Sequence, residues 1–136
     1  MGIVQAEITL KNAFDVANVR RGYIKEPEIR QTTAQAVVDT GAFTLVIDEE
    51  LRQQLGLEKL ATKRVTLANN IKETVYVAEP VEVHWKDRSM ACRPWVVGSG
   101  RILLGAIPLE SMDLIVDPKG QELIGAHGDE EECLLL

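Results

Sequence analysis

The feature that most restricts the fold of this chain is a strict alternation of apolar and polar residues in short stretches. Residues 4–11 alternate without exception, with apolar side chains at the even positions. A period of two places the apolar side chains on one face, so this segment is predicted to be a half-buried β-strand. Further strands are predicted over residues 28–38, 43–47, 81–85 and 90–97. Hairpins are predicted over residues 65–78, with the tip near residues 68–71, and over residues 114–124 at the end. So many short strands predict a mainly β fold, as a barrel or a sandwich.

Short helices are predicted at two places between these strands. Asp48 is a good N-cap residue, two glutamates follow it in the first turn, and Gly56 suits the left-handed position after a helix. A second helix is expected where Pro108 lies near the first turn. Residues 12–27 carry mixed signals and are predicted to form a loop.

The composition is that of one ordinary globular domain. Of 136 residues, 46% are apolar and 26% charged, so the chain can bury a core. We expect one domain over residues 1–128 and a disordered tail over residues 129–136, which begins with four acidic residues. The net charge of −6 argues against a nucleic acid partner, because nucleic acid binding depends on cations that neutralise phosphates.

No part of the sequence is predicted to enter a membrane or to hold a metal. No apolar stretch approaches the roughly 18 residues that cross a bilayer, and the N-terminus does not have the pattern of a secretory signal. Cys92 and Cys133 lie far apart, and His84 and His127 are scattered, so we expect no disulfide framework, no metal and no cofactor, and a reducing cytoplasm. Residues 133–136 fit a prenylation box, but the acidic residues before them would repel an anionic membrane.

The sharpest chemical feature is the cluster Asp39-Thr40-Gly41-Ala42, which lies between two apolar runs. A carboxylate between two buried strands is poorly solvated unless something uses it. Asp and Gly are also ordinary turn residues, so an Asp that only caps a bend explains the same tripeptide. From these residues alone, both interpretations stay open.

Two further segments accompany this cluster along the chain. One is the tip of the hairpin predicted over residues 65–78, and the other precedes the second short helix. They consist of Ala68, Asn69, Asn70 and Ile71 at the hairpin tip, and of Leu103, Leu104 and Gly105 before the helix.

Taken together, these three segments make residues 28–125 resemble the retropepsin-like aspartic proteases, the family of retroviral proteases and their single-domain relatives. The order and spacing of the segments agree with the active-site loop, the flap and the hydrophobic-hydrophobic-Gly signature of that family. The resemblance implies a closed β-barrel with one or two short helices. It also implies that the segment ending in Gly105 supports the active-site loop.

The resemblance assigns the chemistry to Asp39. Two such carboxyl groups about 3 Å apart cannot both ionise, so they share one proton. One then acts as general base on a water molecule, and the other donates to the scissile carbonyl. In the active-site loop, which ends at Ala42, Thr40 is implied to bond to its counterpart. Gly41 lets the loop backbone pack tightly and leaves space for the substrate.

The chain holds a single Asp-Thr-Gly, so the resemblance implies a homodimer with one Asp39 from each subunit. An extended peptide or protein substrate would lie between the active-site loops and the flap, paired as an added strand. One alternative is an inactive dimerisation or peptide-binding module, which the Asn-rich flap tip keeps open. Another is an unrelated β-barrel binding domain in which Asp39 caps a turn.

Overall fold

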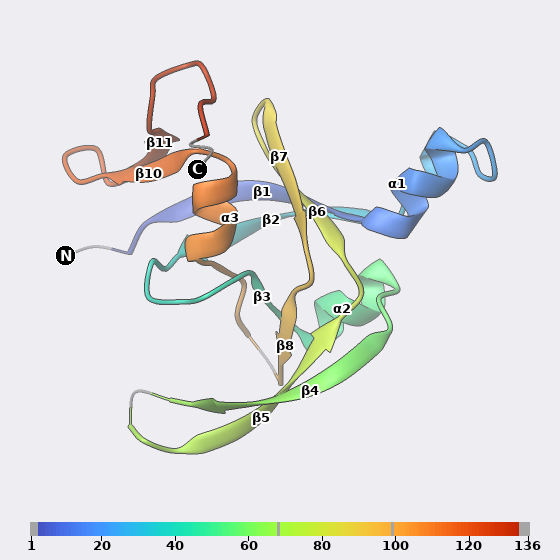
Figure 1. The fold of residues 1–136 in the computed structure, drawn as a ribbon, viewed down its shortest axis with the longest axis horizontal. Coiled ribbons are helices and arrows are strands. Elements are labelled where there is room, and N and C mark those ends of the chain that lie inside the picture. The colour runs from blue at the N-terminus through green and yellow to red at the C-terminus, as the bar shows by residue number, and fades with distance from the viewer. Residues whose placement is uncertain (1–2, 68, 99, 134–136) are drawn as a thin grey trace.

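A computed structural model describes residues 3–67, 69–98 and 100–133. Its main element is a strongly curled sheet, with short helices at the sides and ends of the strands (Figure 1). No helix in these ranges is both long and apolar enough to cross a membrane. The strands are β1 (Gln5–Asn12), β2 (Gln31–Val38), β3 (Val46–Asp48), β4 (Lys59–Thr66), β5 (Lys72–Ala78), β6 (Val81–Trp85), β7 (Arg88–Cys92), β8 (Trp95–Val97), β9 (Leu103–Leu104), β10 (Leu114–Asp117) and β11 (Glu122–Gly125). The helices are α1 (Ala13–Arg20), α2 (Glu49–Leu55), α3 (Ala106–Ser111) and the 3-10 helix η1 (Glu26–Glu28).

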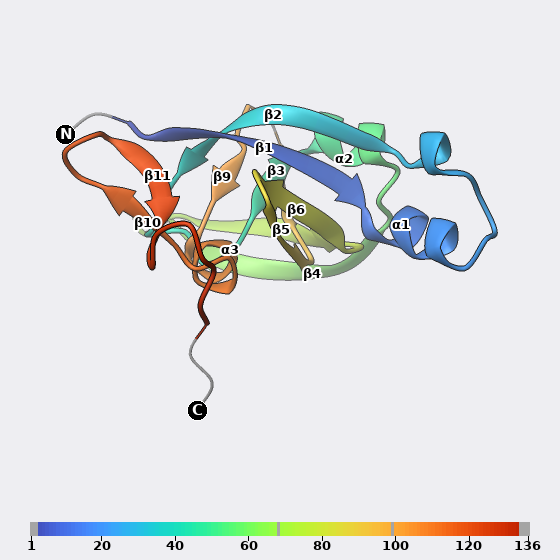
Figure 2. The ribbon, with the colours of Figure 1, turned by 90° about the horizontal axis from the view of Figure 1, so that it is seen from above.

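The nine-stranded sheet has the order β4-β5-β8-β3-β9-β2-β1-β6-β7, and β10 and β11 form a separate hairpin. Its two edges are β4 and β7, and no pairing joins them within the described ranges. The sheet is therefore a curled half-barrel (Figure 2), which confirms the mainly β prediction. The closed barrel that the resemblance implied is not confirmed.

The alternating N-terminal segment forms β1, as predicted. Ala6, Ile8 and Leu10 are 6%, 1% and 0% exposed, and the residues between them are less buried. The strand pairs with β2 on one side and with β6 on the other, so it lies in the interior of the sheet. Its apolar face is part of the main core, and full burial of each Ile or Leu contributes about 1.5–3 kcal/mol.

The prediction of a loop over residues 12–27 was wrong, because helix α1 lies there and brings the number of α-helices to three. Polar contacts from distant residues hold this helix. The Asn12 side chain caps it by accepting the Asp15 N–H at 3.1 Å and donates to the Leu55 carbonyl at 2.9 Å. The Arg30 guanidinium donates twice to the Asp15 carboxylate at 2.9 Å, and these bonds lower the pKa of Asp15.

Helix α2 was predicted correctly, with both of its ends. The Asp48 carboxylate accepts the Leu51 N–H at 2.8 Å, and Gly56 has a φ of 67°. Several strand boundaries were wrong. Strand β4 begins at Lys59, six residues before the predicted start of the hairpin at residue 65. Strand β3 begins three residues later than predicted, and the segment predicted as one strand over residues 90–97 is divided into β7 and β8 at Pro94, which has no N–H for a ladder bond.

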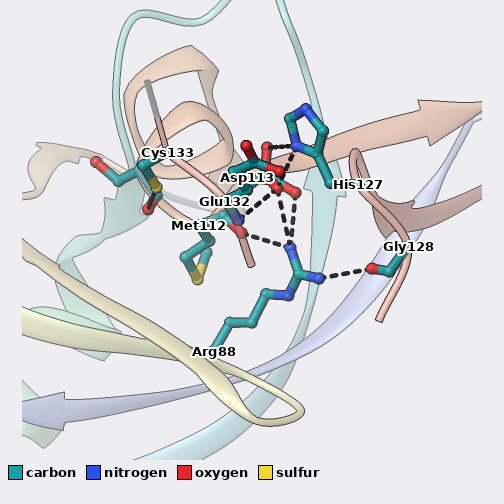
Figure 3. A network of polar contacts seen from close by, with 8 residues as sticks. Arg88, Met112, Asp113, His127, Gly128, Glu132 and Cys133 are labelled. Atoms are coloured by element: carbon teal, nitrogen blue, oxygen red, sulfur yellow. Dashed lines mark hydrogen bonds and ion pairs between the residues drawn. The ribbon is translucent and has the colours of Figure 1, made fainter. Parts of the chain in front are cut away.

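A buried arginine joins the C-terminal part of the chain to the sheet (Figure 3). Arg88, at the start of β7, is only 3% exposed. Its guanidinium donates to the carbonyls of Met112 at 2.9 Å, Asp113 at 2.7 Å and Gly128 at 2.8 Å. These bonds connect the edge strand β7 to the end of α3 and to the loop after β11.

The Asp113 carboxylate fastens the last described residues to the same place. It accepts a bond from His127 Nδ1, at 2.8 Å to Oδ2, and the Glu132 N–H donates to it at 2.9 Å. Cys133 lies against the Ser111 carbonyl at 3.5 Å. The first part of the segment predicted as a disordered tail thus contacts the end of α3. The last three residues of that segment and of the prenylation box lie outside the described residues.

The Asp113–His127 bond predicts a pH-dependent stability. The Asp113 carboxylate raises the pKa of His127. A raised histidine pKa adds stability that is complete below the unfolded value of about 6.5 and is lost as the pH rises through the folded value. The free energy of unfolding should therefore decline above pH ~6.5, and His127→Gln should remove this decline. Urea unfolding between pH 5 and 9 measures it.

The matched control is His84→Gln, which removes the other histidine and should keep the decline. At the acid end the sign is opposite, because the bond with His127 lowers the pKa of Asp113. That contribution is present above the unfolded value of about 3.9 and is lost as the pH falls through the folded one. Parallel stability curves for the wild type and His127→Gln would contradict the prediction.

Candidate active site

Asp39 lies in a tight turn directly after β2. Its carboxylate Oδ1 accepts the Gly41 N–H at 2.9 Å, and its carbonyl accepts the Ala42 N–H at 3.0 Å. Its own N–H donates to the Leu104 carbonyl at 3.0 Å. Asp39 is half-buried, while Thr40 and Gly41 are exposed. The turn thus fixes the backbone and one carboxylate oxygen of Asp39.

The segment predicted to support this turn does lie against it. Strand β9 runs parallel to the end of β2, with Leu103 opposite Val37 and Leu104 opposite Val38. Leu104 is fully buried in the core. A parallel pairing between segments more than 60 positions apart therefore anchors the strand that ends at Asp39.

Gly105 allows helix α3 to begin in contact with the residues that follow the turn. A Cβ atom at this position would lie 2.4 Å from the Thr44 carbonyl oxygen and 2.6 Å from that of Ala42. The Ala106 N–H donates to the Ala42 carbonyl at 2.9 Å, and the Ile107 N–H donates to the Phe43 carbonyl at 3.1 Å. The first turn of α3 thus satisfies two carbonyls of the active-site loop.

We predict that Gly105→Ala destabilises the protein and displaces this loop. The added methyl group would press on backbone atoms, which cannot move aside as a flexible side chain can. The free energy of unfolding should fall by about 1–3 kcal/mol, as for other overpacked sites. Gly98→Ala is the control, because a Cβ there meets no atom within 4 Å. Equal urea midpoints for the two variants would contradict the close approach.

Three large apolar side chains remain exposed near the turn. Phe43 is 61% exposed, Ile107 36% and Ile115 48%. Phe43 and Ile107 are adjacent through the bond between their backbones, and Ile115 lines a surface hollow together with Thr40. These three side chains leave apolar surface exposed beside the turn.

The hairpin predicted to be the flap is formed by β4 and β5, and its tip carries the two asparagines. The Asn69 side chain accepts the Ile71 N–H at 3.1 Å, and Asn70 has a φ of 63°, which asparagine tolerates better than most residues. Ile71 is 57% exposed. Ala68 lies outside the described residues. In Figures 1 and 2 the tip and the loop after β2 extend toward the same end of the molecule.

Cys92 does not offer a nucleophile to this site. Burial raises the pKa of its thiol to about 11, so the thiol is protonated at neutral pH. The described residues contain no group of three His, Cys, Asp or Glu side chains arranged to hold a metal ion. Within residues 39–42, Asp39 is the residue whose side chain can take up or release a proton.

Sequence reasoning missed two parts of the support. Thr44 is 5% exposed, and its carbonyl oxygen lies against Gly105 behind the loop. A threonine in an apolar run looks like any strand residue, so nothing in the sequence marks it. The N–H groups of Ala106 and Ile107 are backbone groups, whose partners no residue type reveals.

Comparison with known families agrees with the geometry of the loop. The family model of the aspartyl proteases, a family of the retropepsin-like clan, matches residues 26–125, which is well over half of the chain. This range includes Asp39, the β4–β5 hairpin and the segment that ends in Gly105. A comparison with curated proteins finds no significant match. On the family match and the loop it contains, the chain belongs to the aspartyl protease family.

Proposed function

We propose that this chain is an aspartic endopeptidase of the retropepsin type, in which Asp39 of each subunit of a homodimer forms the catalytic pair. The observation that carries the proposal is the fixed turn of Asp39, held by Leu104 and by the residues that follow Gly105. An Asp that only capped a bend would not need a second segment packed this closely behind it. The family match supports the same assignment.

The homodimer follows from the chemistry. Peptide hydrolysis by this route needs an ionised carboxylate as general base and a protonated one as general acid, and one chain has one Asp-Thr-Gly. A twofold axis beside the loop would bring the second Asp39 to the first. The exposed side chains of Phe43, Ile107 and Ile115 give such an interface apolar area to bury.

In the proposed reaction, Asp39 of one subunit removes a proton from a water molecule. The resulting hydroxide attacks the scissile carbonyl carbon, while the protonated Asp39 of the second subunit donates to the carbonyl oxygen. The first Asp39 then gives the proton that it took from water to the amine nitrogen, and the C–N bond breaks. As the carbonyl group re-forms, a hydroxyl proton of the intermediate returns to the Asp39 of the second subunit, and the amine leaves. The Gly41 N–H donates to Oδ1 of Asp39, and no described residue donates to Oδ2. In the proposed reaction, Oδ2 is therefore the oxygen that accepts the proton of the water molecule.

A second candidate is a peptide-binding or dimerisation module without catalysis. The observation that favours it is the tip of the hairpin, where Asn69 and Asn70 fix the turn instead of the glycines of retroviral flaps. A fixed tip would close over a peptide less readily than a mobile one.

A peptide-library digest between pH 4 and 8, with and without a statine-type transition-state mimic, separates the two candidates. Cleavage that the mimic inhibits supports the endopeptidase. No cleavage at any pH, with no binding of the mimic, supports the module. Sedimentation equilibrium at micromolar concentration should give about twice the chain mass, and a strict monomer at high concentration would overturn the endopeptidase.

We also propose a reducing compartment, the cytoplasm, for this protein. Cys92 and Cys133 are both free thiols. Free cysteines without a disulfide partner are typical of proteins that work in such a compartment.

A further inference from the structure

The β4–β5 hairpin carries a charge opposite to that of the chain. The chain has a net charge of −6, with more acidic than basic residues. The hairpin nevertheless holds four cationic side chains against one carboxylate, that of Glu73. The cations are Lys59, Lys63, Arg64 and Lys72.

Three of these cations have no counter-ion among the described residues. Lys59 lies 3.7 Å from the Glu49 carboxylate and 4.3 Å from the centre of the Tyr76 ring. Lys63, Arg64 and Lys72 are exposed, and none of them forms an ion pair with a described residue. Unpaired like charges on one hairpin repel one another, so an anionic ligand would relieve this repulsion.

The register places these cations on both faces of the hairpin. Lys63 is opposite Val75, Arg64 is opposite Thr74, and Thr66 is opposite Lys72. Since side chains alternate between faces, Arg64 and Lys72 are diagonal neighbours on one face. Lys63 lies on the other face, together with the buried Val75.

The backbone of β4 is also open to a ligand. Strand β4 is an edge of the nine-stranded sheet, and residues 59–64 are all exposed. In the described ranges no other strand pairs with the outer side of β4. An extended peptide can pair with such an edge through main-chain hydrogen bonds, while nearby side chains select its sequence.

We propose that the β4–β5 hairpin binds acidic extended peptides through Lys63, Arg64 and Lys72, so that substrates carry Asp or Glu residues. The statement about substrates rests on the proposed endopeptidase function. The statement about peptide binding rests on the hairpin alone. Three exposed charge pairs together should raise the affinity for an acidic peptide, relative to a neutral one, by roughly tenfold at low salt.

The test uses two statine-centred peptides of equal length, one with glutamates at the flanking positions and one with glutamines. Fluorescence anisotropy measures the binding of each to the wild-type protein in 50 mM and 500 mM salt. We expect about tenfold tighter binding of the glutamate peptide at low salt, and nearly equal binding at high salt. Equal affinities at low salt would overturn the inference.

Variants assign the effect to the hairpin. The triple variant Lys63→Gln, Arg64→Gln, Lys72→Gln should lose the preference for glutamate. The matched control replaces three exposed cations at the other end of the molecule, by Arg20→Gln, Arg21→Gln, Lys25→Gln, and should keep it. A preference that survives in the hairpin variant overturns the inference. The inference is also overturned if the hairpin variant aggregates but keeps its preference for the glutamate peptide. The cations would then only protect the edge strand β4 from pairing with other chains.

The two proposals fail in different ways. If the glutamate peptide binds preferentially and the library digest yields no cleavage, the endopeptidase fails and the acidic-peptide site stands. If the protein cleaves neutral peptides as readily as acidic ones, the acidic-peptide site fails and the endopeptidase stands. Circular dichroism of both triple variants checks that each is folded.

Discussion

Asp39→Asn should abolish peptide hydrolysis and leave the fold intact. Neither subunit of the variant can act as general base, because an amide does not take the proton of a water molecule between pH 4 and 8. The Asn side chain keeps the size of Asp and an oxygen that can accept the Gly41 N–H, so the turn should survive. Loss of this one group should lower kcat by at least about 10²–10⁴-fold.

The measurement combines hydrolysis of a peptide found in the library digest with urea unfolding of the same samples. Asp48→Asn is the matched control, since it makes the same chemical change at the N-cap of α2. Asparagine caps a helix about as well as aspartate, so this control should keep both activity and stability. Hydrolysis by Asp39→Asn at the wild-type rate would refute the catalytic pair. Equal losses in both variants would point to a general effect of lost charge.

The elements that depend on neighbouring residues in the sequence could be predicted, because short patterns of residue types determine them. The alternation of β1 and the caps of α2 both lie within a few residues of the elements they define. The shape of the sheet could not be predicted, because it depends on which distant strands pair. The parallel contact of β2 with β9 and the unpaired edges β4 and β7 have no local signal.

The same distinction applies to the candidate site. The motif at Asp39 and the segment before Gly105 carry recognisable residue types, and the structure brings these two segments together. The contacts of Arg88 carry no such signal, because an arginine that follows a turn looks like a surface residue until its carbonyl partners are known. Backbone partners are chosen by tertiary packing, which one sequence does not reveal.

Arg88→Met should be among the most destabilising single substitutions in this chain. The variant loses the bonds to the carbonyls of Met112, Asp113 and Gly128, and it leaves the Asp113 carboxylate without the nearby guanidinium at 3.8 Å. Buried acceptors without partners cost about 1–3 kcal/mol each, and removal of one partner of a buried pair costs about 3–5 kcal/mol. We expect a loss of about 3–5 kcal/mol, a large share of the roughly 5–15 kcal/mol of a typical domain.

Two further variants separate the hydrogen bonds of Arg88 from its charge. Arg88→Lys keeps the charge but lacks the planar fork that reaches three carbonyls, so it should lose less than Arg88→Met and more than about 1 kcal/mol. Arg93→Met removes an exposed arginine nearby and should change the free energy of unfolding by no more than about 0.5 kcal/mol. Urea unfolding ranks the three. If Arg88→Met were as stable as Arg93→Met, the bonds of Arg88 would not hold the C-terminal segment.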